Sequence, residues 1–226
     1  MLYSEENVRA AVRNQDGKRV FWMGEDDRLT PSARDWLKSE GIEVVKRAKT
    51  YTTLFGGEFQ QKPEEMTHLS GNVLVPKTHP RIAFRGKIDA LEAEILLTQQ
   101  AVRENTALVN ALQEMLDFVR SLIRADVLGE AVKAVRLCGL SDAELREHSH
   151  FPHRYYGQPH FLPSHTDGAA ILRLNRLRTL VRDTELACCR AFSDRDGKIT
   201  RPDMVQALNR LSSLCWILMI RQKASK

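Results

Sequence analysis

The chain has 226 residues, of which 42% are hydrophobic and 28% charged, and its 34 Lys and Arg residues against 29 Asp and Glu residues give a net charge of +5. This mixture excludes an intrinsically disordered chain. The positive excess is spread along the chain, which excludes a basic tail for nucleic acid and leaves small anions open as partners.

The N-terminus and the cysteines point to one cellular location. The first residues carry Glu5, Glu6 and Arg9 and lack the apolar run of a secretory signal. The longest apolar run, residues 214–220, is far shorter than the roughly 20 residues that span a bilayer. The four cysteines form neither a disulfide framework nor a CxxC pair. We therefore expect a cytoplasmic protein that binds neither membrane nor nucleic acid.

Residues 1–47 predict a small α/β element of alternating helices and strands. The Val-, Phe- and Trp-containing run 18–23 is typical of a strand. Thr30 followed by Pro31 predicts a helix start, with Gly41 at its end and another strand over 42–45. Residues 48–66 show no hydrophobic period and predict a linker or loop.

From His79 onward the apolar spacing is helical. It predicts two long helices, a shorter helix opened by the capping-box pattern Ser141–Glu144, and two further helices, the last one over 201–220 with Thr200 as its cap. Residues 148–167 read as a loop rich in His and Pro. The predicted fold is mainly α, a five-helix-type bundle over residues 67–226 with a small N-terminal α/β appendage.

Two segments imitate metal sites. The loop holds five histidines, which could bind zinc, but it has no cysteine and no strong HxxxH frame, and a polar loop near an active site is the favoured interpretation. The five are His148, His150, His153, His160 and His165. Residues 193–200 resemble part of a calcium loop, but Phe192 occupies the first ligand position, which favours a plain turn between helices.

Arg178, Arg182 and Glu185 are spaced to share one helical face. A solvated ion-paired face and a phosphate-binding face are both open, because a guanidinium donates two parallel hydrogen bonds to phosphate oxygens. A second set of charged residues comprises Arg81, Arg85 and Asp89. Their spacing favours an ordinary intrahelical ion pair between Arg85 and Asp89.

Taken in order, six segments resemble the ethanolamine-utilisation cobalamin adenosyltransferases, which are related to the propanediol-utilisation type. The segments are residues 65–70, 75–90, 123–130, 139–145, 177–185 and 201–213. The resemblance implies a helical bundle, commonly trimeric, with ATP near a subunit interface. It also implies the reaction, in which ATP and cob(I)alamin give adenosylcobalamin and a phosphate product, with the adenosylcobalamin serving ethanolamine ammonia-lyase.

The resemblance also implies roles for single residues. It places Arg178, Arg182 and Asp89 in the catalytic machinery, with Asp89 pairing with Arg178. It assigns ATP contacts to Thr67, His68, Lys77, Arg182, Glu185, Asn209 and Arg210. Glu185 would also contact Mg²⁺ bound with ATP, and Phe161 is the candidate for the aromatic residue that faces the corrin.

The chain departs from the family pattern in two informative ways. Many ethanolamine-type members carry a metal-binding His and Cys run that residues 48–66 lack, so we predict no zinc or iron held by Cys or His. Distant relatives have two adjacent arginines where this chain has Arg182 and Asp183, which leaves one phosphate contact open. The N-terminal 47 residues suggest a docking or oligomerisation element.

These features predict an ATP:corrinoid adenosyltransferase that self-associates and works in the cytoplasm or in a bacterial microcompartment. Ethanolamine ammonia-lyase or its reactivase are the expected protein partners. Two alternatives remain at this point: another nucleotide-dependent transferase with the same polyphosphate cradle, and a corrinoid or nucleotide carrier or helical adaptor without turnover.

Overall fold

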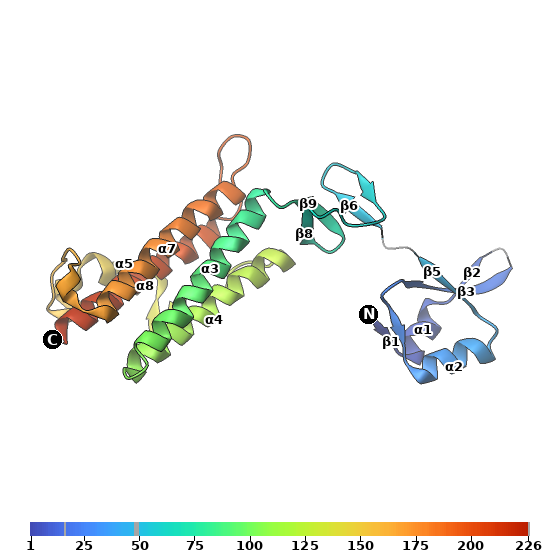
Figure 1. Ribbon diagram of the computed structural model, residues 1–226, viewed down its shortest axis with the longest axis horizontal. Helices are drawn as coiled ribbons and strands as arrows, with labels where there is room; N and C mark the ends of the chain where they lie inside the picture. The colour runs from blue at the N-terminus through green and yellow to red at the C-terminus, as the bar shows by residue number, and fades with distance from the viewer. Residues whose placement is uncertain (16, 48–49, 226) are drawn as a thin grey trace. The chain divides into compact units, whose positions relative to one another are not determined.

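The computed structural model describes residues 1–15, 17–47 and 50–225 (Figure 1). It divides into two compact units, Met1–Val75 and Pro76–Lys226. None of the described helices is long and apolar enough to cross a membrane.

The first unit is built from short strands and two helices. In chain order these are β1 Leu2–Tyr3, α1 Glu5–Ala11, β2 Arg13–Gln15, β3 Lys18–Gly24, β4 Arg28–Leu29, α2 Pro31–Ser39, β5 Glu43–Arg47, β6 Tyr51–Thr53, β7 Glu58–Phe59, β8 Met66–Ser70 and β9 Val73–Pro76. The sheets are β1-β4, β2-β3-β5 and β7-β6-β9-β8. A small core joins the helices to β3, with Val8, Phe21, Met23, Ala33, Leu37 and Ile42 buried.

Local signals placed α2 correctly. Thr30 caps the helix by accepting a hydrogen bond from the backbone N–H of Ala33, and Pro31 stands at its first position. Gly41 has a φ of 61°, a left-handed conformation that ends the helix before β5. The strand predicted over 18–23 is confirmed as β3.

The segment 48–66, predicted to be a linker, is different in the structure. Residues 48 and 49 lie outside the described residues, but the rest contributes β6 and β7 to a four-stranded sheet. Thr52 and Thr53 of β6 pair in parallel with Val73 and Leu74 of β9. Strands of two or three residues are too short to show the alternation of apolar and polar residues that predicts a strand. The partner β9 of β6 lies about 20 residues further along the chain, so the local sequence does not indicate their pairing. Along the chain, the division between the compact units accordingly falls after Val75 rather than at the predicted boundary before residue 67.

The second unit is a helical bundle, as predicted. Its elements are α3 Pro80–Ala101, α4 Thr106–Leu128, β10 Arg136–Leu137, β11 Leu140–Ser141, α5 Asp142–His150, α6 Pro152–Tyr156, the 3₁₀ turn η1 His165–Asp167, α7 Ala169–Ala191 and α8 Pro202–Ala224. Four long helices, α3, α4, α7 and α8, form the body of this unit, and the shorter α5 packs on α8 (Figure 1).

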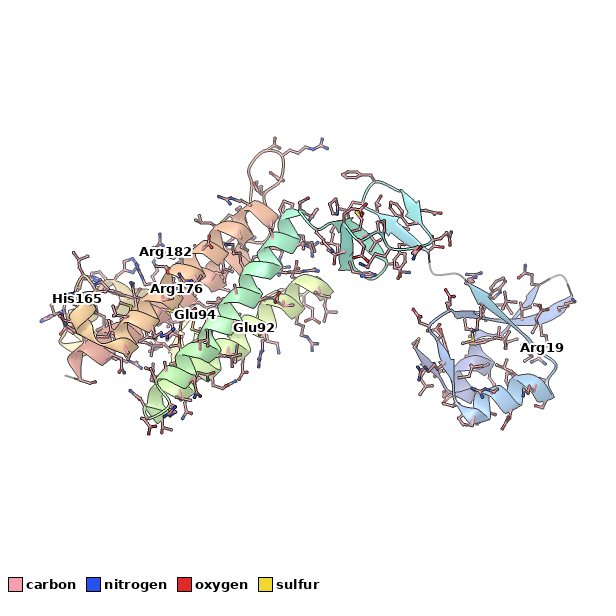
Figure 2. The ribbon with its side chains drawn as sticks, viewed as in Figure 1. Arg19, Glu92, Glu94, His165, Arg176 and Arg182 are labelled. Atoms are coloured by element: carbon pink, nitrogen blue, oxygen red, sulfur yellow. The ribbon has the colours of Figure 1, made fainter. Side chains whose placement is uncertain are left out.

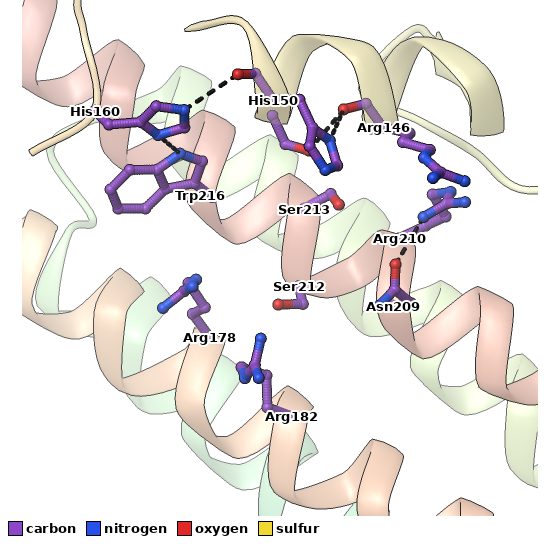
Figure 3. Close-up of a pocket in the computed structure, with 11 residues that line it drawn as sticks. Arg146, His150, His160, Arg178, Arg182, Asn209, Arg210, Ser212, Ser213 and Trp216 are labelled. Atoms are coloured by element: carbon purple, nitrogen blue, oxygen red, sulfur yellow. Dashed lines mark hydrogen bonds between the residues drawn. The ribbon is translucent and has the colours of Figure 1, made fainter.

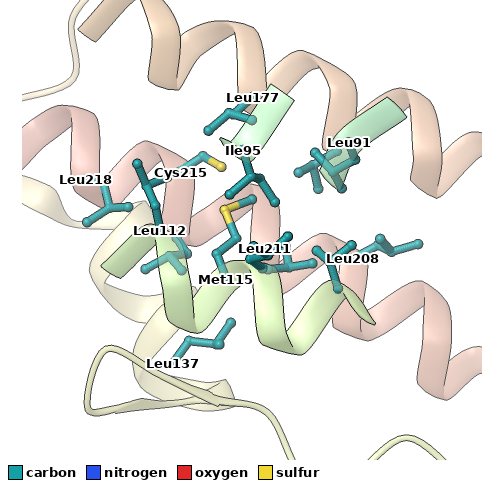
Figure 4. Packing of buried hydrophobic residues seen from close by; sticks show 14 of the residues in the cluster. Leu91, Ile95, Leu112, Met115, Leu137, Leu177, Leu208, Leu211, Cys215 and Leu218 are labelled. Atoms are coloured by element: carbon teal, nitrogen blue, oxygen red, sulfur yellow. The ribbon is translucent and has the colours of Figure 1, made fainter. Parts of the chain in front are cut away.

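The core of the bundle is a continuous apolar cluster. Leu91 and Ile95 of α3, Met115 of α4, Leu177 of α7 and Leu211 of α8 are all fully buried in it (Figure 4). Burying each such side chain contributes roughly 1.5–3 kcal/mol. The four long helices are therefore held together by a large apolar contact.

Buried and half-buried ion pairs also join these helices. Asp126 of α4 is fully buried as a side chain and accepts hydrogen bonds from Arg81 (Nη2–Oδ1, 2.6 Å) and Arg85 (Nε–Oδ2, 2.7 Å) of α3. The predicted intrahelical Arg85–Asp89 pair is therefore wrong, because both arginines point across to α4. Glu94 of α3 similarly lies near Arg176 of α7 (Figure 2).

Two further predictions need correction. Residues 148–167 are not all loop: α5 runs to His150, and α6 and η1 follow. Thr200 does not cap α8, because its hydroxyl donates to the carbonyl of Phe192 and the N-cap position belongs to Arg201. The capping box at Ser141 is confirmed, since its hydroxyl accepts from the N–H of Glu144 while the Glu144 carboxylate accepts from the Ser141 N–H.

Candidate functional site: an arginine-lined pocket

A pocket of about 540 Å³ opens between α5, α7 and α8 of the second unit (Figure 3). Arg178 and Arg182 project into it from α7. Arg146 and His150 come from α5, and His160 from the segment after α6. The α8 side is formed by Asn209, Arg210, Ser212, Ser213 and Trp216. Helical spacing explains the pairs, because residues three or four apart share a face.

Three of the four arginines in the pocket have no carboxylate partner among the described residues: Arg146, Arg178 and Arg182. Elsewhere in the bundle, Arg120 and Arg173 are examples of exposed arginines that pair with acidic side chains, although not every exposed arginine there does so. Three guanidinium groups without a carboxylate partner around one concave surface have the charge and geometry that suit a multiply charged anion.

Arg210 is different, because its side chain is only 9% exposed and already has partners. Its Nε donates to Asp142 Oδ1 at 2.8 Å, and its Nη1 donates to Asn209 Oδ1 at 2.7 Å. The amide nitrogen of Asn209 then donates to Glu185 Oε1 of α7 at 3.2 Å. These contacts tie α5, α8 and α7 together at the edge of the pocket.

The other end of the pocket is aromatic. The ring of Trp216 stacks with those of His160 and Phe161, at centroid distances of 5.7 and 5.3 Å. The guanidinium of Arg178 lies 5.4 Å from the Trp216 ring centroid. The indole N–H of Trp216 donates to His160 Nδ1 at 3.2 Å, and because indole is only a donor, His160 Nδ1 accepts and its Nε2 donates to the carbonyl of His150.

The structure thus brings together Arg178, Arg182, Asn209 and Arg210 of the predicted site, with Glu185 lining an adjoining pocket that shares Asn209. Phe161 contacts the aromatic end through Trp216. Sequence reasoning missed Arg146 and Trp216, whereas His160 belongs to the histidine-rich segment that was predicted to lie near an active site. Arg146 lies in the short helix that the capping box at Ser141 predicts, but no sequence pattern indicates that this helix packs near α7.

The remaining predicted residues are not among those that line the pocket. Thr67 and His68 are on β8 of the first unit, whereas every residue of the pocket belongs to the second. Lys77 is exposed just before α3 and does not line the pocket. Asp89 is exposed on α3 and, within the part of the chain described, does not form the expected pair with Arg178, which faces Trp216 instead.

Asp183, which stands where distant relatives have a second adjacent arginine, has a partner on α3. Its carboxylate accepts a hydrogen bond from the ammonium group of Lys87 of α3 at 2.6 Å. A second arginine at this position would face a cation, so Asp183 ties α7 to α3 rather than contributing to an anion site.

The histidine-rich segment is engaged in hydrogen bonds and ring contacts. His148 Nδ1 lies 2.7 Å from the Tyr156 hydroxyl, and the His148 ring stacks on Tyr155. His150 Nδ1 lies 2.7 Å from the Arg146 carbonyl. Among the residues described, no group of three or more His, Cys, Asp or Glu side chains is placed to hold a metal ion.

Comparison with known proteins identifies the family. The family model described as cobalamin adenosyltransferase matches residues 59–222. The chain belongs to the cobalamin adenosyltransferase family. It is 35% identical to the corrinoid adenosyltransferase EutT of Escherichia coli K12, over 96% of this chain and 90% of the relative, and 34% identical to EutT of Salmonella typhimurium LT2 over the same shares.

A solved structure shares the bundle fold of this cobalamin adenosyltransferase family member. It is a variant of the PduO-type ATP:corrinoid adenosyltransferase from Lactobacillus reuteri complexed with cobalamin and ATP, with a TM-score of 0.54 and 20% identity, covering 71% of this chain and 89% of that one. The similarity confirms the mainly α bundle predicted from the sequence. The predicted family resemblance is confirmed as well.

Proposed function

We propose that the chain is an ATP:cob(I)alamin adenosyltransferase, which transfers the 5′-deoxyadenosyl group of ATP to the cobalt of cobalamin. The observation that supports this most is the group of three unpartnered guanidiniums, Arg146, Arg178 and Arg182, around one pocket of a cobalamin adenosyltransferase family member. A polyphosphate is the anion that such a group suits.

The chemistry asks for positioning and charge stabilisation more than for a protein nucleophile. The electron pair of Co(I) forms the bond to C5′ of the ribose, the C5′–O bond breaks, and its electrons leave with the polyphosphate. The arginines stabilise the negative charge of this leaving group and hold the ribose in line with the cobalt. Arg178 and Arg182, which share one face of α7, have this task.

Asn209 and Glu185 complete the proposed ATP site at this pocket, and the ATP contacts that the family resemblance implies for Lys77, Thr67 and His68 stay predictions. Asn209 and Glu185 lie at its rim, joined by their hydrogen bond. Mg²⁺ prefers oxygen ligands and is commonly held by one or two carboxylates together with phosphate oxygens. The Glu185 carboxylate fits that requirement, and the bound ion would neutralise part of the phosphate charge.

Cobalamin is the second substrate, and the aromatic end of the pocket supports its placement there. Phe161 and Trp216 offer a flat apolar wall beside Arg178. We propose that Phe161 faces the lower side of the corrin, where a phenyl ring keeps an axial ligand away from cobalt and eases the reduction of Co(II).

We also propose that the chain self-associates. Asp89 and Arg178 have no charged partner in the described protomer, and a second copy would supply one to each. The likeness to EutT supports service to ethanolamine ammonia-lyase, with the work done in the cytoplasm or a microcompartment.

The test is an anaerobic incubation of the purified chain with MgATP and chemically reduced cobalamin. We expect the Co(I) spectrum to give way to that of a light-sensitive Co–C product. Tight binding of both ligands without spectral conversion would instead identify a carrier and overturn the proposal.

A further inference from the structure

Two arginines meet at the edge of the pocket, and their surroundings differ. Figure 3 shows the ends of the Arg146 and Arg210 side chains next to each other, one from α5 and one from α8. Arg210 is buried and hydrogen-bonded to Asp142 and Asn209. Arg146 is exposed, and within the described chain its guanidinium has no carboxylate partner.

We infer that Arg146 is a direct contact of the polyphosphate and that Arg210 is a positioning residue acting through Asn209. The inference rests on the proposed function. It reassigns Arg210, which the family resemblance had placed among the ATP contacts.

The case for Arg210 as a positioning residue follows from donors and acceptors. An asparagine side chain can be turned either way, because its oxygen and nitrogen ends have the same shape. Arg210 can only donate, so it fixes Oδ1 of Asn209 on its own side, and Glu185 accepts from the nitrogen on the other. The ion pair with Asp142 at 2.8 Å offsets the charge of Arg210, so little of it is left for a ligand.

The case for Arg146 follows from charge. Arg146 lies one helical turn after Asp142, which accepts a hydrogen bond from Arg210. The helix α5 therefore carries both the carboxylate that binds Arg210 and the unpaired guanidinium of Arg146 on one face. Apart from the regular bonds of α5, the hydrogen bonds of Arg146 in the described chain are accepted by its backbone carbonyl, from Ser149 and His150, and none involves its guanidinium. The guanidinium is thus free to meet an anion held by Arg178 and Arg182.

The experiment measures binding of MgATP, tripolyphosphate and adenosine to the full chain by calorimetry. We expect Arg146→Gln to weaken MgATP and tripolyphosphate roughly 10-fold, the usual effect of losing one charged hydrogen bond, and to leave adenosine unchanged. The matched control is Arg103→Gln, which removes an exposed arginine that pairs with its neighbour Glu104 outside the pocket. If Arg146→Gln binds tripolyphosphate as tightly as Arg103→Gln does, the assignment is overturned.

Arg210 is tested by a double-mutant comparison. If Arg210 acts through Asn209, the single variant Asn209→Ala and the double variant Asn209→Ala/Arg210→Gln have the same affinity for MgATP. Their changes in kcat and in KM relative to the wild type are then also the same. A further loss of about 10-fold in the double variant would show a direct contact and overturn the positioning role. Arg210→Lys replaces Arg210→Gln in both comparisons if the latter does not fold.

Failure of the inference can be told from failure of the proposed function. A wild-type chain that adenosylates cobalamin while Arg146→Gln behaves like the control refutes only the division of tasks. A wild-type chain that binds neither MgATP nor tripolyphosphate refutes the proposed function and this assignment together.

Discussion

The amide nitrogen of Asn209 lies 3.2 Å from a carboxylate oxygen of Glu185, which joins α8 to α7 at the rim of the arginine-lined pocket. The two residues are 24 positions apart in the chain. Their contact places a neutral amide and a carboxylate on the α7–α8 side of the pocket, and the proposed Mg²⁺ contact of Glu185 rests on this arrangement.

Replacing Arg182 tests the leaving-group role. We expect Arg182→Ala to lower adenosylation by about 10²–10³-fold, the usual cost of removing one preorganised electrostatic contact, with circular dichroism and thermal unfolding unchanged. Arg176→Ala on the same helix is the control, because Arg176 is exposed and faces Glu94. Unchanged turnover and ATP affinity in Arg182→Ala would refute the assignment.

Asp126 links the start of α3 to α4. Its side chain is fully buried and meets two arginines, Arg81 and Arg85. We expect Asp126→Asn to lower the free energy of unfolding by about 3 kcal/mol, because the substitution leaves half-buried guanidinium groups without a counter-charge.

The measurement for Asp126 is urea unfolding followed by circular dichroism. Glu92→Gln, which breaks the more exposed pair with Arg120, should cost less than about 1 kcal/mol. Equal effects of the two substitutions would contradict the importance of the buried pair.

Asp203 makes stability depend on pH in the acid range. The hydrogen bonds from Arg201, with a further one from the Val132 N–H, lower its pKa from 3.8 to about 2. The unfolded chain takes up this proton first as the pH falls, so the stabilisation is complete above about pH 4 and is lost between about pH 4 and pH 2.

We therefore expect the free energy of unfolding to fall more steeply between about pH 4 and pH 2.5 in the wild type than in Asp203→Asn. Asp196→Asn, in the exposed turn before α8, should keep the wild-type slope. The same slope in all three proteins would refute the role of Asp203.

The four thiols should be poorly reactive in the folded chain. Burial raises the pKa of Cys138 to about 11 and those of Cys188 and Cys215 to about 12, and it also raises the pKa of Cys189. Because the thiolate is the reactive form, iodoacetamide at neutral pH should label the native chain slowly and the urea-unfolded chain at all four positions. Rapid labelling of Cys188 in the native chain would contradict this expectation.

Phe161 tests the proposed corrin contact. We expect Phe161→Ala to raise KM for cobalamin and to lower kcat when Co(II) is the starting substrate and an added one-electron reductant supplies the electron that converts it to Co(I). MgATP affinity should stay within about twofold, because the phenyl ring makes no contact with phosphate in the proposed site. Leu162→Ala is the neighbouring control, since Leu162 is 92% exposed. Equal kinetics for the two variants would exclude Phe161 from the site.

The sequence by itself determined the helical bundle, the caps at Thr30 and Ser141, and the arginines of α7, because these depend on spacing and on groups within a few residues of each other. Only the tertiary structure decided which charges are compensated. Arg85 looked like the partner of Asp89 but binds Asp126, 41 positions away, and Arg210 is neutralised by Asp142, 68 positions away. Charge pairing of this kind depends on which helices pack together, so a free arginine such as Arg146 becomes recognisable only after α5 has been placed against α8.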